Sequence, residues 1–218
     1  MSAMSTPSIT DQNPAMSLLG PLRLAEADLL TTLAREARGG CIVEIGSMRG
    51  KSTVALALGS KQGQGLPVFA IDPHEAYITD TGDQYIGPPD RAAFMSSISS
   101  MGFADIVRLV NLSSEVVCAG WHEPVCLLWI DGDHAAESVR RDLRCWESFL
   151  IPGAPVAFHD SLDTKFGVHI VIKEALASGR YRFDRVEDRT TVLRVVRRSR
   201  FPRLTRILNR YYAISFRR

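Results

Sequence analysis

Short apolar runs alternate along the chain with longer segments whose apolar residues recur every three or four positions. The runs have the length and composition of buried strands, and the longer segments have the spacing of one helix face. Repeated strand–helix pairs predict a parallel sheet with helices on both faces. The predicted strands are residues 41–45, 67–72, 106–110, 125–131 and 155–160, and the predicted helices are residues 21–38, 51–60, 90–101, 135–150 and 168–177, with a shorter one from Ser114.

Two further β-rich runs follow the last predicted helix. They cover residues 181–187 and 190–196, and only Asp188 and Arg189 separate them. So short a connection joins antiparallel strands. The expected fold class is therefore α/β, with a doubly wound seven-stranded sheet that is mostly parallel and ends in an antiparallel hairpin.

The predicted elements form one folded domain, residues 18–197, between two different end segments. Residues 1–17 are polar and aperiodic, which predicts a mobile leader. Residues 198–218 form a basic tail with four apolar residues on one helical face: Leu204, Ile207, Leu208 and Tyr211. A basic amphipathic helix suits docking on the domain or on a second copy in a homo-oligomer, peripheral contact with an anionic membrane surface, or a solvated extension.

Charge is distributed unevenly between the domain and the tail. The 218-residue chain has a net charge of +2, but from Arg189 onward it contains ten arginines and no acid. The 16 basic and 24 acidic residues before Arg189 give a net charge of −8, so we expect no nucleic-acid partner. The cysteines lack C-x-x-C spacing and the N-terminus lacks a secretory pattern. These features predict a cytoplasmic protein, located at the inner membrane surface if the tail binds lipid.

Polar residues and glycines gather where the predicted parallel strands end. In an open α/β sheet, ligands bind beyond the carboxyl ends of the strands. All of these ends carry glycine or polar residues, whereas the strand bodies are apolar. The segments expected to form the functional site are residues 46–52, 72–74, 111–114, 131–134 and 159–161.

The turn after the first strand is bounded by Gly46 and Gly50. A phosphate-binding loop has four residues between its glycines and this turn has three, which argues against a nucleoside triphosphatase. The glycines allow close approach of a ligand, and the next helix offers free amides to a carboxylate. Glu44 is an acid within an apolar strand, and Asp72 is placed to bind the hydroxyls of a ribose. A ligand with a carboxylate and a ribose but no phosphate describes S-adenosylmethionine.

Four sequence blocks occur in order: Glu44-Ile-Gly46-Ser-Met-Arg-Gly50-Lys-Ser52, Ala70-Ile-Asp72-Pro, Trp129-Ile-Asp131-Gly-Asp-His134 and Phe158-His159-Asp160. Together they resemble the class I S-adenosylmethionine-dependent methyltransferases. Within that class the chain is most similar to the macrocin-type sugar O-methyltransferases and cephalosporin-hydroxylase-like proteins. The resemblance extends from about Cys41 to Val196 and implies a Rossmann-like sheet and methyl transfer to a hydroxyl of a sugar, glycolipid or glycosylated natural product.

The resemblance also implies where the cofactor binds. The glycine turn would hold the methionine part, Asp72 the ribose, and Ser114 the adenine. The family usually has Gly-Asp-Ser near the adenine, whereas this chain has Leu112-Ser113-Ser114. The expected cofactor-binding residues are Glu44, Gly46, Ser47, Gly50, Ser52, Asp72, Ser114 and Asp131.

Methyl transfer to an alcohol needs alignment and a deprotonated oxygen, which a divalent ion or a base supplies. Asp131 and Asp160 end neighbouring strands, and carboxylate oxygens suit Mg²⁺. The resemblance implies a metal site of Asp131, His159 and Asp160, with His134, or else His159, as the base. His159 departs from the expected oxygen ligand, and an imidazole suits Mn²⁺ better than Mg²⁺.

Other interpretations remain open from the sequence. Asp131-Gly-Asp133 also matches the D-x-D motif of metal-dependent nucleotide-sugar transferases, although Asp133 equally suits the N-cap of the next helix. A metal-independent methyltransferase with a histidine base, a nucleotide-dependent transferase and a non-catalytic cofactor-binding protein are the remaining alternatives.

Overall fold

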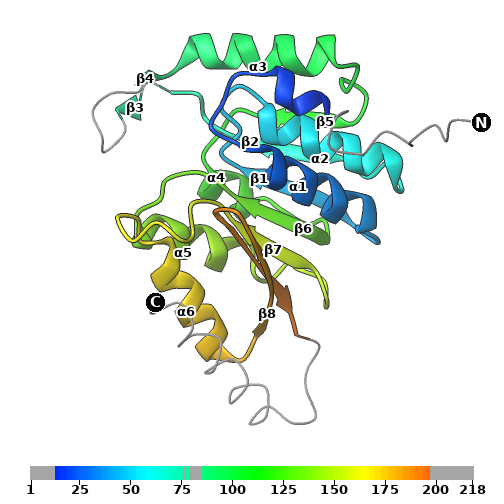
Figure 1. Ribbon diagram of the computed structural model, residues 1–218. Coiled ribbons are helices and arrows are strands. Elements are labelled where there is room, and N and C mark those ends of the chain that lie inside the picture. The colour runs from blue at the N-terminus through cyan, green and yellow to red at the C-terminus, as the bar shows by residue number, and fades with distance from the viewer. Residues whose placement is uncertain (1–12, 76, 79–84, 197–218) are drawn as a thin grey trace, which may run out of the picture.

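The computed structural model describes residues 13–75, 77–78 and 85–196 (Figure 1). Its main sheet has seven strands in the order β5-β2-β1-β6-β7-β9-β8. The first five in this order pair in parallel, and β9 is antiparallel to both of its neighbours. The strands are β1 (Cys41–Ile45), β2 (Val68–Ile71), β5 (Val107–Val110), β6 (Val125–Ile130), β7 (Pro155–Phe158), β8 (Tyr181–Glu187) and β9 (Thr190–Val195). The predicted Rossmann-like sheet with a C-terminal antiparallel hairpin is confirmed.

Helices cover both faces of this sheet in two layers, as Figure 1 shows. Neighbouring residues of a strand pack into opposite layers, so that Ile42 contacts the α1–α2 layer and Val43 the α5–α6 layer. Trp129 and Trp146 are among the largest fully buried side chains, one in each layer. The helices are α1 (Leu24–Glu36), α2 (Lys51–Gln62), α3 (Pro88–Ser100), α4 (Ser114–Ala119), α5 (Ala136–Trp146) and α6 (Val168–Ser178), with a 3-10 turn, η2 (Pro14–Ser17).

The structure describes the last part of the segment expected to be the leader. The side chain of Asn13 donates hydrogen bonds to Asp28 and Thr31 on α1, and Ala15 is fully buried. Asn13 and Ala15, from the segment expected to be the leader, therefore pack against α1, and the bounds of leader and domain stay a prediction. The polar composition of the segment hid these contacts, because the segment is anchored by one amide and one small apolar side chain.

A short β-ribbon follows β2 and was not predicted. It pairs β3 (Tyr77–Ile78) with β4 (Tyr85–Ile86), and two-residue strands are too short to leave an alternating pattern in the sequence. Residues 1–12 of the expected leader and the basic tail, residues 198–218, lie outside the described residues. Within the described ranges, no helix combines the length and the apolar character needed to cross a membrane.

Candidate functional site

The glycine turn lies against the tip of β6. Gly46 has φ +82°, and a Cβ there would lie 2.3 Å from the backbone oxygen of Asp131. The Asp131 amide donates a hydrogen bond to the Ile45 carbonyl at 2.8 Å, which joins the end of β6 to the end of β1. Gly50, with φ +87°, precedes the first residue of α2. Glycine is thus required at position 46 both by the backbone conformation and by the close approach.

Asp72 fastens this turn to the end of β2. Its Oδ2 accepts the backbone amides of Ser47 at 2.9 Å and Met48 at 2.8 Å, and its Oδ1 accepts the amide of His74 at 2.8 Å. The side chain is almost fully buried. The ribose-binding role of Asp72 stays a prediction, and the structure adds that the same carboxylate sets the shape of the turn.

Glu44 lies beneath α2, on the layer of the sheet that α1 and α2 cover. Its carboxylate accepts the hydroxyl groups of Ser52 and Thr53, and the side chain is completely buried. Burial raises the pKa of Glu44 to about 8, because the two hydroxyl donors offset only part of the desolvation and Asp131 and Asp72 add negative charge. The cofactor-binding role of Glu44 stays a prediction, and the structure adds that its carboxylate is bonded to the first turn of α2.

This raised pKa predicts a pH-dependent stability. The folded protein keeps the Glu44 proton up to a pH of about 8, whereas the unfolded chain releases it near 4.5. Between these values the folded state binds more protons, so the free energy of unfolding falls as the pH rises. Urea unfolding between about pH 5 and about pH 8 is expected to show a loss on the order of 3 kcal/mol for the wild type that Glu44→Gln lacks. Equal slopes for the two proteins would contradict this assignment.

The remaining turn and adenine candidates lie at the same end of the sheet. The hydroxyl of Ser47 is buried and has no hydrogen-bond partner among the described residues, which leaves it available to a ligand. Ser114 begins α4, and its hydroxyl accepts the indole N–H of Trp146 at 2.9 Å. The pKa of the nearby buried Asp142 is raised to about 6 by desolvation, even though the Ser114 hydroxyl contacts it.

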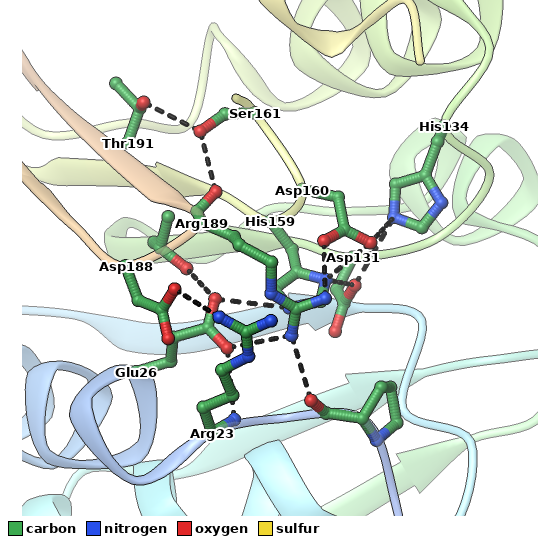
Figure 2. A network of polar contacts seen from close by, with 12 residues as sticks. Arg23, Glu26, Asp131, His134, His159, Asp160, Ser161, Asp188, Arg189 and Thr191 are labelled. Atoms are coloured by element: carbon green, nitrogen blue, oxygen red, sulfur yellow. Dashed lines mark hydrogen bonds and ion pairs between the residues drawn. The ribbon is translucent and has the colours of Figure 1, made fainter. Parts of the chain in front are cut away.

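The predicted second centre forms at the ends of β6 and β7 (Figure 2). His159 Nδ1 lies 2.8 Å from Asp131 Oδ1 and 3.5 Å from Asp160 Oδ2. His134 Nε2 lies 3.6 Å from Asp131 Oδ1 and 3.7 Å from Asp160 Oδ2. The structure thus brings together all four residues that the sequence singled out for this centre.

The two histidines have different environments. His159 is buried, and burial alone would lower its pKa, but the carboxylate of Asp131, with Glu26 and Asp160, raises that pKa to about 10. An imidazole that stays protonated at neutral pH is a poor base. His134 is half-buried, and its Nε2, like both ring nitrogens of His159, has no hydrogen-bond partner in the described part of the chain. The assignment of His134, or else His159, as the base and of His159 as a metal ligand stays a prediction.

Asp133 belongs to the helix that follows the site. Its Oδ1 accepts the amide of Ala135 at 3.1 Å, and its Oδ2 accepts the hydroxyl of Ser138. Both oxygens are thus bonded near the start of α5, although the N-cap position itself is Ala135 and not Asp133. This geometry leaves the D-x-D interpretation without its second carboxylate.

The family model of a methyltransferase domain matches residues 43–161. The chain belongs to this methyltransferase family. The matched segment runs from β1 to the end of β7, and so it contains the glycine turn, Asp72 and the second centre. The protein is a class I S-adenosylmethionine-dependent methyltransferase, as the sequence motifs indicated.

Solved methyltransferase structures have the same fold. An O-methyltransferase from Bacillus cereus, in complex with SAH (S-adenosylhomocysteine), is 18% identical with a TM-score of 0.62, covering 88% of this chain and 93% of that one. TomG from Streptomyces achromogenes, in complex with S-adenosylmethionine, is 17% identical with a TM-score of 0.59 and coverages of 89% and 92%. CalS11, a calicheamicin methyltransferase, is 16% identical with a TM-score of 0.61 and coverages of 77% and 76%.

Two residues that the sequence did not reveal adjoin the second centre. Glu26, from the first turn of α1, lies 3.4 Å from His159 Nε2, and Arg189, from the β8–β9 turn, donates to Asp160 Oδ1 at 2.8 Å. Figure 2 shows both beside His159 and Asp160. In the sequence, Glu26 looks like any acid near a helix N-terminus and Arg189 like the first residue of the basic segment. Neither residue carries a local signal, because Glu26 and Arg189 contact each other although they are 163 residues apart in the sequence.

Proposed function

We propose that this methyltransferase transfers the methyl group of S-adenosylmethionine to a hydroxyl oxygen of a small molecule, with a sugar or glycosylated natural product as the acceptor class. The observation that carries the proposal is the cluster of Asp131, His134 and Asp160 beside the glycine turn. Such a group of carboxylates and an imidazole can bind and activate a hydroxyl. Two similar structures are described as O-methyltransferases, and a structure of CalS11 is described as a TDP-rhamnose 3'-O-methyltransferase, which supports a sugar acceptor.

A divalent ion fits the second centre. Asp131, His134 and His159 each offer one ligand atom, and these atoms lie within 4.8 Å of one another. Because His159 also lies between Glu26 and Asp131, we propose that Asp160, whose Oδ2 lies 3.7 Å from His134 Nε2, replaces it as the third ligand beside Asp131 and His134. A bound ion would lower the pKa of a coordinated hydroxyl. The mixed nitrogen and oxygen set favours Mn²⁺ over Mg²⁺.

A metal-independent reaction is the second candidate, and one observation favours it. The Nε2 of His134 lies 3.6 Å from Asp131 Oδ1 and 3.7 Å from Asp160 Oδ2 and has no hydrogen-bond partner among the described residues. In that case His134 takes the proton of the acceptor hydroxyl, and Asp131 and Asp160 hold the imidazole in place.

Calorimetry and a methyl-transfer assay test these proposals. We expect the protein to bind SAH but not ATP, and to methylate TDP-rhamnose or a related hydroxyl acceptor. EDTA should reduce the rate by at least about tenfold, and Mn²⁺ should restore it. Binding of ATP without SAH would reject the methyl-transfer proposal. Rates that are unchanged by EDTA would reject the metal and leave the histidine base.

A further inference from the structure

Glu26 lies in the first turn of α1. One oxygen of its carboxylate points toward the Asp131 side of the second centre, and the other points toward the Asp160 side. Its Oε1 lies 3.4 Å from His159 Nε2, and the opposite ring nitrogen, Nδ1, lies 2.8 Å from Asp131 Oδ1. One oxygen of Glu26 thus reaches Asp131 through a single imidazole ring. The three groups form a carboxylate–imidazole–carboxylate chain that is buried along most of its length.

The other oxygen reaches the second carboxylate in the same way. Oε2 of Glu26 accepts Arg189 Nη2 at 3.0 Å, and Nη1 of that guanidinium donates to Asp160 Oδ1 at 2.8 Å. The fork shape of the guanidinium fixes the relative position of the two carboxylates it joins. Asp160 needs such support, because its φ of +46° lies in the left-handed region that a non-glycine residue rarely adopts.

We infer that Glu26 is a positioning residue that fixes Asp131 through His159 and Asp160 through Arg189. The role in catalysis rests on the proposed function, whereas the positioning itself does not. We call the Glu26–His159–Asp131 and Glu26–Arg189–Asp160 connections the two arms. Both begin at the carboxylate of Glu26, which is fully buried. We call the carboxylates of Asp131 and Asp160 the rim carboxylates. Their spacing, and with it their distance from His134, therefore depends on α1, which contributes no other described residue to the second centre.

Fastening α1 to the hairpin does not by itself require both arms. The Arg23 amide donates to Glu26 Oε2, and the Thr190 hydroxyl donates to Glu26 Oε1, each at 3.0 Å. Arg23 also pairs with Asp188 at the tip of the hairpin. These contacts hold the helix without touching the rim carboxylates, and they supply matched control variants.

Glu26→Gln tests the inference, since the amide has nearly the same shape but can accept from only one of the two cations. We expect its crystal structure to show the His159 ring rotated and the Asp131–Asp160 spacing changed. Titration of the protein with Mn²⁺, followed by electron paramagnetic resonance, is expected to show an affinity about tenfold or more below that of the wild type. Thr190→Val removes a hydrogen bond to Glu26 and Asp188→Asn removes a neighbouring negative charge, and both are expected to bind Mn²⁺ within about twofold of the wild type.

The outcomes separate positioning from a purely structural role. One result would overturn the inference: Glu26→Gln loses thermal stability, but its crystal structure shows an unchanged Asp131–Asp160 spacing and its Mn²⁺ affinity equals that of Asp188→Asn. Should Glu26→Gln not fold, Arg189→Lys removes the guanidinium fork while keeping its charge, and Asp160 alone is then expected to move. A wild type that binds neither SAH nor Mn²⁺ would reject the proposed function, and the crystal structures would still decide whether Glu26 positions the rim.

Discussion

Asp131→Asn is expected to lower the rate of methyl transfer by about 1,000-fold, because the substitution removes a charge that both proposed mechanisms use. Asp131 Oδ1 is close to His134 and to His159, at 3.6 Å and 2.8 Å. A metal ion would lose a charged ligand, and a histidine base would lose the carboxylate that holds its imidazole in place. The loss should therefore appear in kcat, measured with saturating S-adenosylmethionine and acceptor.

The same substitution two residues later supplies the control. Asp133→Asn changes a carboxylate that is bonded to the start of α5, so its rate is expected to stay within about twofold of the wild type, with a small loss of stability. Both variants should bind SAH in calorimetry with affinities within about fivefold of the wild type, since neither carboxylate shapes the glycine turn. Full activity of Asp131→Asn, or equal losses in the two variants, would remove Asp131 from the reaction.

The fold could be predicted because each element has a strong local pattern. The predicted strand at residues 41–45 agrees with β1 at both ends, and the hairpin strands agree to within a residue. Helix ends were less accurate. Helix α1 begins at Leu24 and not at Pro21, because the backbone of Arg23 is still extended. Such boundaries depend on where the chain packs, which the spacing of apolar residues does not specify.

The residues of the candidate site that follow the strand ends could also be predicted, for a topological reason. Parallel strands place their carboxyl ends at one edge, so Asp131 and His159 had to meet once the strands were assigned. The contacts of the His159 ring nitrogens could not be predicted from the sequence. The role of His159 as a ligand or base stays a prediction, and the structure adds that it lies between Glu26 and Asp131, with a pKa raised to about 10 by Asp131, Glu26 and Asp160. That outcome depends on a partner from α1 that no motif indicates.

Asp72 shows the same limit at the cofactor end. The position of a carboxylate after β2 follows from the sequence, but its three bonds to backbone amides do not. Those bonds depend on Met48 and His74 adopting positive φ angles of 43° and 47°. Non-glycine residues rarely show this conformation, so a sequence pattern does not predict it. The turn is therefore defined jointly by its glycines and by a carboxylate from the neighbouring strand.

Gly46→Ala is expected to destabilise the protein by about 4 kcal/mol or to prevent its folding, which would be the largest stability loss among the variants considered. The new Cβ would lie 2.3 Å from the oxygen and 2.6 Å from the carbonyl carbon of Asp131. Both are backbone atoms of a central strand end, so they cannot move without breaking the pairing of β1 with β6. The variant also forces a non-glycine residue to φ +82°. Urea unfolding of both proteins measures the difference.

Gly65→Ala separates the two causes. Gly65 also has a positive φ, +66°, but a Cβ there would meet no atom within 4 Å. Its substitution therefore carries only the conformational cost, about 1 kcal/mol. Where Gly46→Ala folds at low temperature, the separation of β1 from β6 should also weaken SAH binding, since the turn amides held by Asp72 would move with it. Equal stability losses at positions 46 and 65 would mean that the close approach of the turn to Asp131 does not constrain residue 46.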